Sequence, residues 1–171
     1  YTLTGHIKTR LDNDGIVIER NNMTLDGASY TIKGANLFSY PKGIHMSERS
    51  NVTIKNIRID SFYYGVCLDN SSSSSVLQTK VMNDQEGIEL YGSTRNTISN
   101  NSITNNGKSI GLYYSSNNTI VGNNIASNSE GILLVESSNC SIAGNNLTSN
   151  HNGIFVTGSS SCSIARNQIA V

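Results

Sequence analysis

The sequence predicts an all-β fold in which the chain winds as a single-stranded parallel β-helix of about eight coils. One phrase recurs with a period of 22 residues, as in "GIELYGSTRNTISNNSITNN" (87–106) and "GILLVESSNCSIAGNNLTSN" (131–150). Repeats of fixed length indicate a stacked architecture. Within each unit, apolar residues alternate in short runs that clusters of Asn, Ser and Gly separate. This pattern is typical of short strands joined by turns.

Residues 43–171 form the regular part of the predicted helix. Each unit opens on a small residue, and these openers are Gly43, Gly65, Gly87, Ser109, Gly131 and Gly153. Four apolar columns follow the openers at constant offsets, beginning at Ile44, Met46, Ile54 and Ile59. A single coil cannot bury its apolar residues, but stacked neighbours can. The columns therefore predict the core.

Residues 1–42 follow the same plan less strictly. A longer coil of 28 residues starts at Gly15, and "NNMTLDGASYTIKG" (21–34) supplies its next two strands. Residues 1–14 resemble an incomplete first coil. Because no linker interrupts the pattern, we expect one domain over residues 1–171.

Composition narrows the classes of function. Only 14% of residues are charged, the net charge is zero and Trp is absent. We therefore expect no nucleic-acid partner and no basic face for membrane binding. The longest apolar run, 132–135, is too short for insertion into a membrane.

Asparagine-rich stretches allow two explanations. Seven Asn-x-Ser/Thr sites would suit a secreted glycoprotein: Asn22, Asn51, Asn70, Asn100, Asn117, Asn139 and Asn146. With 24 Asn and 26 Ser in the chain, such triplets also arise from composition. Asn tolerates left-handed turns, and stacked Asn side chains can form hydrogen-bonded ladders. We expect ladders in two columns: Asn106, Asn128 and Asn150 after Asp84, and Asn101, Asn123, Asn145 and Asn167.

The phrases "NNMTLDGASYTIKG", "NVTIKNIRI" and "GIELYGSTRNTISNNSITNN" resemble the NosD-like, pectate-lyase-like family of carbohydrate-binding and sugar-hydrolase repeats. The resemblance covers nearly the whole chain. It implies a right-handed β-helix, in agreement with the usual hand of parallel crossovers. It also implies an archaeal type of surface protein, located outside the cell or on its surface. This fold carries lyases, hydrolases, epimerases, adhesins and scaffolds, so it does not fix the function.

An acid–base site would lie on the outward positions of the first strand of each coil. Asp69 and Glu89 lie in adjacent coils there, and His45 is one coil further away. They are the candidate catalytic residues, although an ordinary solvated sheet face is the favoured explanation for them. His6, His45 and His151 are dispersed, so we expect neither a metal site nor a cofactor.

The same outward face becomes apolar toward the C-terminus. A contiguous patch is expected from Tyr91, Tyr113, Leu133, Val135 and Phe155. Residues 1–86 hold 18 charged side chains, and residues 87–171 hold 6. The patch could steady the sheet, contact a partner or stack on sugar rings.

The sequence contains three cysteines. Cys140 and Cys162 are one repeat apart in one column, close enough for a disulfide or for two stacked thiols. Cys67 is expected on the outward face, as a plain thiol or as a link between molecules.

The last coil ends "SIARNQIAV", and neither end of the chain reads as a capping segment. Open strand edges invite head-to-tail pairing. The sequence therefore favours an extracellular structural protein that assembles with itself into a sheath, surface layer or filament. A carbohydrate-binding or polysaccharide-cleaving module, or a repeat domain of a larger adhesin, are the alternatives.

Overall fold

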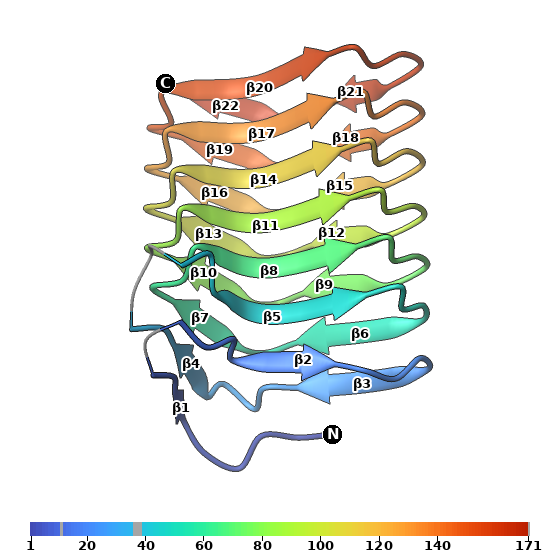
Figure 1. Ribbon diagram of the computed structural model, residues 1–171. Helices are drawn as coiled ribbons and strands as arrows, with labels where there is room; N and C mark the ends of the chain where they lie inside the picture. Colours follow the sequence, from blue (N-terminus) through green and yellow to red (C-terminus); the bar gives the residue numbers. More distant parts are fainter. Residues whose placement is uncertain (11, 36–38, 171) are drawn as a thin grey trace.

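The computed structural model describes residues 1–10, 12–35 and 39–170, and within them every regular element is a β-strand. The strands form three parallel sheets around one axis (Figure 1). In Figure 1 the nearer strands run to the right, the chain returns behind them, and each coil lies above the last, so the helix is right-handed. The predicted fold class is confirmed.

Sheet 1, with seven strands, carries the first strand of every complete coil. Its strands are β2 (Ile16–Ile18), β5 (Lys42–Ser47), β8 (Tyr64–Asp69), β11 (Glu86–Tyr91), β14 (Lys108–Tyr113), β17 (Glu130–Val135) and β20 (Asn152–Thr157). Sheet 2 also has seven strands. They are β3 (Met23–Asp26), β6 (Val52–Lys55), β9 (Ser75–Leu77), β12 (Thr97–Ser99), β15 (Thr119–Val121), β18 (Ser141–Ala143) and β21 (Ser163–Ala165).

Sheet 3 has eight strands. They are β1 (Ile7–Lys8), β4 (Thr31–Lys33), β7 (Arg58–Asp60), β10 (Lys80–Met82), β13 (Ser102–Thr104), β16 (Asn124–Ala126), β19 (Asn146–Thr148) and β22 (Gln168–Ala170). The extra strand β1 belongs to the incomplete first coil, so about seven full turns follow it. Ile16 pairs with Ile44, a step of 28 residues, and Ile44 then pairs with Val66, a step of 22.

The apolar columns meet inside the coil as predicted. Ile44, Met46, Ile54 and Ile59 are buried, and so are their partners in the coils that follow, up to Ile132, Leu134, Ile142 and Leu147. In the last coil, Val156, Ile164 and Ile169 are 36%, 48% and 49% exposed. The core is therefore a continuous stack whose columns are covered from one side only in the last described coil.

The opening glycines are required by close packing between coils. A Cβ atom built on Gly65 would lie 2.5 Å from the carbonyl oxygen of Gly87 and 2.6 Å from a methyl of Val81. Neither contact is possible for a real side chain. Ser109, which replaces glycine at this position of its own coil, donates its hydroxyl to the carbonyl of Gly131.

Both predicted asparagine ladders are present. Asn101 Nδ2 donates to Asn123 Oδ1 over 3.0 Å, and the bonds from Asn123 to Asn145 and from Asn145 to Asn167 measure 2.9 Å. Each of these amides also donates to a carbonyl of the preceding coil, as Asn123 Nδ2 does to Ile98 O. The side chains thereby satisfy buried backbone groups at the corners between sheets.

A third, serine-based ladder was not predicted. The hydroxyls of Ser71, Ser93, Ser115 and Ser137 each accept a backbone N–H from the preceding coil, at 2.8 to 3.1 Å. Serine is too common in the chain for its period to be noticed beside the asparagines.

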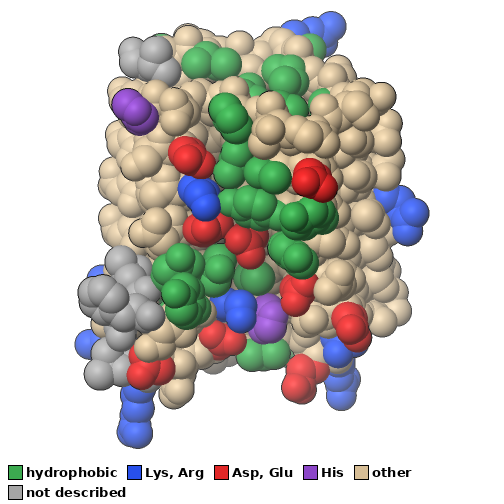
Figure 2. All heavy atoms as spheres, turned by 45° about the horizontal axis from the view of Figure 1, so that its top comes forward, with side chains coloured by type: hydrophobic (Ala, Val, Ile, Leu, Met, Phe, Trp, Pro, Cys, Tyr) green, Lys and Arg blue, Asp and Glu red, His purple; other side chains and the backbone are tan. Residues whose placement is uncertain are grey.

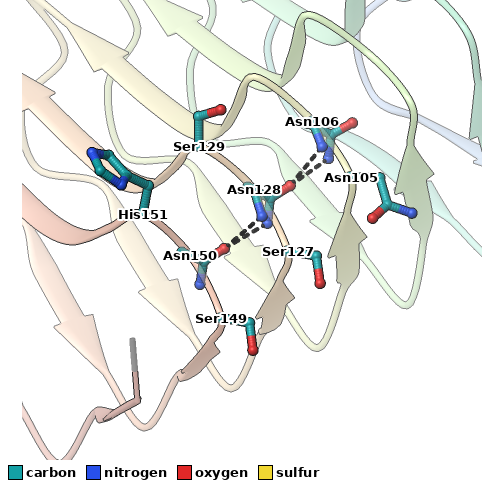
Figure 3. Close-up of a pocket in the computed structure, with 8 residues that line it drawn as sticks. All are labelled: Asn105, Asn106, Ser127, Asn128, Ser129, Ser149, Asn150 and His151. Carbon is teal, nitrogen blue, oxygen red and sulfur yellow. Dashed lines mark hydrogen bonds between the residues drawn. The ribbon is translucent and has the colours of Figure 1, made fainter.

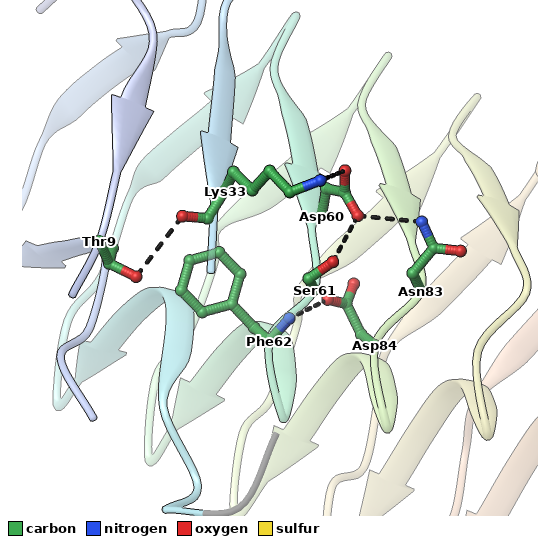
Figure 4. A network of polar contacts seen from close by, with 7 residues as sticks. All are labelled: Thr9, Lys33, Asp60, Ser61, Phe62, Asn83 and Asp84. Carbon is green, nitrogen blue, oxygen red and sulfur yellow. Dashed lines mark hydrogen bonds and ion pairs between the residues drawn. The ribbon is translucent and has the colours of Figure 1, made fainter. Parts of the chain in front are cut away.

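Asp84 begins the second asparagine ladder beside a network around Asp60 (Figure 4). Asp84 Oδ1 accepts the N–H of Phe62 over 2.7 Å, while its Oδ2 is buried without a partner. Burial raises the pKa of Asp84 well above its usual value. Asp60 accepts hydrogen bonds from Asn83 and Ser61 and pairs with Lys33 at 3.2 Å. These contacts outweigh burial and lower the pKa of Asp60.

Candidate functional site

The outer face of sheet 1 carries three columns of outward side chains. They are aligned because the strands pair in register. The first column is Lys42, Tyr64, Glu86, Lys108, Glu130 and Asn152; the second is His45, Cys67, Glu89, Gly111, Leu133 and Phe155; the third is Ser47, Asp69, Tyr91, Tyr113, Val135 and Thr157. Figure 2 shows charged and hydrophobic side chains together on this face, amid surfaces that are mostly uncharged and polar.

The three candidate catalytic residues share one face, where the charge of Asp69 acts on both His45 and Glu89. Asp69 is the register partner of Tyr91, in a different column from Glu89, and its Oδ1 accepts a hydrogen bond from Asn70. His45 Nδ1 lies 3.9 Å from Asp14 Oδ2. Burial, helped by the charge of Lys42, lowers the pKa of His45, so this imidazole is neutral near pH 7.

The partner of Glu89 is Glu86, which lies three residues earlier on the same strand and was not among the predicted residues. Burial raises the pKa of Glu89 to about 8, and the nearby Glu86 carboxyl contributes to the same shift. Two close carboxyl groups resist ionising together. Glu89 therefore carries a proton at neutral pH and can donate it. Strict strand alternation would turn residues 86 and 89 to opposite faces, so the sequence pattern alone did not predict this pair. The strand pairing omits Gly87, between Glu86 and Ile88.

Glu86, Lys108 and Tyr113 form a chain of polar contacts. Lys108 Nζ lies 3.0 Å from Glu86 Oε1 and 3.0 Å from the hydroxyl of Tyr113. The two contacts outweigh burial and raise the pKa of Lys108, which keeps the ammonium charged. The Glu86 carboxyl also accepts a hydrogen bond from protonated Glu89, which adds to the raised pKa of Glu89.

Gly111 makes this arrangement possible. A Cβ atom on Gly111 would lie 2.9 Å from the ring of Tyr113. Because the glycine has no side chain, the Tyr113 ring folds over the second column and reaches Lys108. Sequence reasoning placed Tyr113 in an apolar patch, but its hydroxyl belongs to the charged cluster.

The rest of the predicted patch is unevenly exposed. Tyr91 and Phe155 are 48% and 55% exposed, Val135 is half-buried and Leu133 is only 9% exposed. Tyr91 also packs against Tyr114, with ring centroids 5.6 Å apart in an edge-to-face arrangement. Figure 2 shows a hydrophobic band beside the charged groups on this face. Of the predicted residues, Tyr91 and Phe155 offer the most open rings.

The structure describes the surroundings of all three cysteines. Cys67 lies in the outward column, but neighbouring side chains bury it to 4% exposure, and burial raises the pKa of its thiol to about 12. Burial therefore disfavours a link between molecules at Cys67. Cys140 and Cys162 are free thiols, which is one of the two alternatives expected for this pair. They continue a column that Asn96 and Asn118 occupy in earlier coils.

In that column the two thiols contact backbone carbonyl oxygens, as the asparagine amides do in earlier coils. Cys140 Sγ contacts Ser115 O at 3.4 Å, just as Asn118 Nδ2 donates to Ser93 O at 2.9 Å. Cys162 Sγ makes the equivalent contact with Ser137 O at 3.3 Å. Burial raises the pKa of the Cys140 thiol, and the neighbouring Cys162 thiol adds to the shift.

Six of the seven glycosylation sequons have a structural explanation. Their asparagines are exposed and adopt positive φ, between 47° and 61°. These are Asn22, Asn51, Asn70, Asn100, Asn117 and Asn139. The seventh, Asn146, lies in β19 and donates to Asn124 over 3.0 Å. Left-handed turns favour asparagine whether or not a glycan is attached, so glycosylation stays a prediction.

Two open surface hollows lie away from the charged face of sheet 1. One, of about 760 Å³, follows the corner between sheets 3 and 1 beside His151 and the second asparagine ladder (Figure 3). Its amides are engaged with one another, as Asn106 Nδ2 is with Asn128 Oδ1 over 3.0 Å. The other, of about 400 Å³, lies at the N-terminal coil and is mainly apolar, with Ile16, Ile18 and Leu25 in its wall.

Known proteins were compared with the chain. A model of the family described as periplasmic copper-binding protein (NosD) matches residues 4–170. Among solved structures, the periplasmic alginate epimerase AlgG is similar, with a TM-score of 0.64 and 17% identity over 86% of this chain and 47% of that chain. The enzymatically active domain of tailspike protein 2 from bacteriophage CBA120 has a TM-score of 0.67 and 14% identity over 99% of this chain and 38% of that chain.

An alginate lyase from Paenibacillus sp. str. FPU-7 is also similar, with a TM-score of 0.59 and 13% identity over 86% of this chain and 66% of that chain. No curated protein matches the sequence. These identities establish a shared fold only. The chain spans less than half the length of the epimerase and of the tailspike domain.

Copper, which the family description names, does not fit the side chains present. Copper sites need His, Cys or Met ligands grouped in space. Among the residues that the structure describes, no three of His, Cys, Asp and Glu are placed to hold a metal ion. His45 and Cys67 are register partners, but the raised pKa of the buried thiol opposes the thiolate that a metal requires. Within the described ranges, no helix could cross a membrane.

Proposed function

Because the chain belongs to the NosD family, whose model matches nearly all of it, we propose that it is a polysaccharide-binding module that works outside the cytoplasm. Its glycan would lie along the outer face of sheet 1. The family description is periplasmic, and the epimerase it resembles in fold is also periplasmic. The polysaccharide-directed names of the fold relatives support a glycan as the ligand class.

One observation carries the proposal, namely the cluster of Glu86, Glu89, Lys108 and Tyr113. It gathers a charged amine, a phenol, a carboxylate and a protonated carboxyl on one face. Sugar hydroxyls both donate and accept hydrogen bonds, so a mixed set of donors and acceptors suits them. The exposed ring of Tyr91 lies on the same face, where a sugar could pack on it.

The decisive experiment is a binding screen followed by matched variants. The purified protein is screened by calorimetry against neutral, cationic and anionic oligosaccharides. Tyr91→Ala should weaken binding about five- to tenfold through the lost ring contact. Glu89→Gln, which keeps a donor but removes the titrating proton, should leave binding near pH 7 largely intact and flatten its pH dependence.

Glu19→Gln, an exposed carboxyl at the N-terminal coil, is the matched control and should change nothing. Thermal unfolding of each variant checks the fold. If no oligosaccharide of any charge binds, or if Glu19→Gln has the same effect as Tyr91→Ala, the proposal is wrong.

End-to-end assembly is a second candidate function, because the inward columns finish in exposed Val156, Ile164 and Ile169. A coil from a second copy, stacked on β20, β21 and β22, would bury them. Light scattering and negative-stain imaging would detect the filaments, and Ile164→Asp should dissolve them. Since Cys67 is buried, reductant should have no effect. A monodisperse monomer at high concentration would contradict this candidate.

A further inference from the structure

Lys108 and Glu86 are in contact on the outer face of sheet 1. They are register partners in β14 and β11, and Lys108 Nζ is 3.0 Å from Glu86 Oε1. Only 31% of the Lys108 side chain and 10% of the Glu86 side chain is exposed. The fold therefore holds an amine against a carboxyl group where little water reaches, and where two charges are poorly solvated.

A second carboxyl group joins this contact. Glu89, three residues after Glu86 on β11, donates a hydrogen bond to the Glu86 carboxyl. Burial is the main cause that raises the pKa of Glu89 to about 8, so its proton is in place at neutral pH. Lys108, Glu86 and Glu89 together supply a nucleophile, an acyl group and an acid.

We propose that the Lys108 amine and the Glu86 carboxyl condense to an amide that links two successive coils covalently, with Glu89 as the proton donor. The bond forms within the folded chain and needs no cofactor or second protein. The inference is independent of the proposed function, because the amide keeps one hydrogen-bond donor and one acceptor on this face, and the ring of Tyr91 stays exposed.

The reaction balances within the three side chains. A proton passes from Lys108 Nζ to the Glu86 carboxylate, which leaves a neutral amine beside a neutral carboxyl group. The Nζ lone pair then forms a bond to Cδ of Glu86. The Glu89 proton goes to the departing oxygen, which leaves as water, and the surplus proton on the nitrogen returns to Glu89. One ammonium and one carboxylate thus become one amide and one water molecule.

Two physical effects favour the amide at this position. For well-oriented groups, contact is equivalent to an effective concentration of about 10⁵–10⁸ M. The reaction also removes two charges that are costly to keep partly buried. Tyr113 positions the amine, because its hydroxyl accepts a hydrogen bond from Lys108 Nζ over 3.0 Å.

The charged pair is the resting state, so the bond should form slowly after folding. The contacts of Lys108 with Tyr113 and Glu86 outweigh burial and raise the pKa of its amine, which makes the neutral amine rare. The pKa of Glu89 near 8 describes the chain before the bond forms, while Glu86 still carries its carboxyl group.

Two other pairs of lysine and aspartate among the described residues provide a comparison. Lys33 lies 3.2 Å from Asp60, and Lys55 lies 3.2 Å from Asp26. Hydrogen bonds outweigh burial and lower the pKa of Asp60, and the N–H of Ala28 lowers the pKa of Asp26. Both carboxyl groups therefore stay ionised and resist attack by an amine, so these two pairs should remain ion pairs.

Intact-mass measurement of the full chain tests the inference. The folded protein should be lighter than its sequence by one water molecule, in a fraction that rises with incubation. Trypsin after denaturation then locates the bond, because it does not cleave at a linked Lys108. Peptide 81–95 should appear joined to peptide 96–166, whereas the open chain yields 81–95, 96–108 and 109–166 as separate peptides.

Lys108→Arg is the diagnostic variant, because arginine keeps the positive charge but has no amine to form this bond. It should keep the full mass of its sequence. Glu89→Gln should slow bond formation about a hundredfold or more, the effect expected of a lost general acid. Lys33→Arg is the matched control, at a lysine that pairs with Asp60, and should form the bond as the wild type does.

The wild-type protein alone can overturn the inference, whether or not the variants fold. A full sequence mass after prolonged incubation would do so, as would a water loss that maps to other peptides. In variants that circular dichroism shows to be folded, water loss in Lys108→Arg or an unchanged rate in Glu89→Gln would also overturn it. Sugar binding is tested separately by the oligosaccharide screen, so the two proposals can fail independently.

Discussion

Asp84 occupies a position that asparagine fills in the three following coils of its column. Its carboxyl is buried, with Oδ2 unpartnered, and burial raises its pKa well above the ordinary 3.8. The unfolded chain loses this proton near pH 4, whereas the folded chain keeps it to higher pH. Folding stability is therefore lost as pH rises from that value through the folded pKa.

We predict that Asp84→Asn stabilises the protein near pH 7 by about 1–3 kcal/mol, because an amide can both accept and donate hydrogen bonds, as the ladder asparagines do. The difference between variant and wild type should shrink toward pH 4. Denaturant unfolding at several pH values measures it. Asp60 contributes in the opposite direction, because its pKa is lowered and its stabilisation is lost on acidification. Both proteins contain Asp60, so this contribution cancels in the difference between their unfolding free energies. A destabilised variant at pH 7 would contradict the ladder argument.

Glu89 should titrate near pH 8 rather than near its ordinary 4.5. Carbon-13 NMR of the side-chain carboxyl measures this directly. Because burial is the larger cause, Glu86→Gln should lower the pKa of Glu89 only part of the way toward 4.5. The raised pKa also means that Glu89 makes the fold less stable as pH rises from about 4.5 to about 8. A wild-type value near 4.5 would remove the proton donor from the candidate site.

At the scale of the element, the corner ladders hold the turns between sheets. Asn123 accepts from Asn101 and donates to Asn145 Oδ1 and Ile98 O. We predict that Asn123→Ala costs about 2–4 kcal/mol of unfolding free energy, since several buried groups lose their partners together. The neighbouring Asn124→Ala, on the exposed face of β16, should cost less than about 1 kcal/mol. Equal losses would show that the ladder adds nothing beyond the sheet.

The strands and their register could be predicted because the 22-residue period repeats one inward pattern, so every coil tests the same assignment. The site could not be predicted in the same way, because it breaks the pattern. Gly111 occurs once in its column, and its consequence is a ring orientation at Tyr113. The burial of Cys67 likewise depends on the side chains that surround it. These two effects depend on contacts between side chains of neighbouring coils, and the repeat period alone does not predict such contacts.

At the scale of the whole molecule, stability is distributed along the axis, because each coil contacts mainly the coils before and after it. Ile142 is fully buried between two coils, whereas its column neighbour Ile164 is 48% exposed in the last coil. We predict that Ile142→Ala costs about 3–4 kcal/mol. Ile164→Ala should cost less than about 1 kcal/mol in dilute protein, since the residue has a coil on one side only.

Measuring the stability of these two variants at several protein concentrations tests assembly. If a second copy stacks on the last coil, it buries Ile164, and the cost of Ile164→Ala must grow with concentration because association stabilises the folded state by mass action. The cost of Ile142→Ala has no such dependence beyond that of the wild type. Thermal unfolding over a hundredfold range of concentration measures both. A cost for Ile164→Ala that stays small throughout this range would mean that the exposed end of the column does not bind another copy, and the face of sheet 1 would remain as the functional surface.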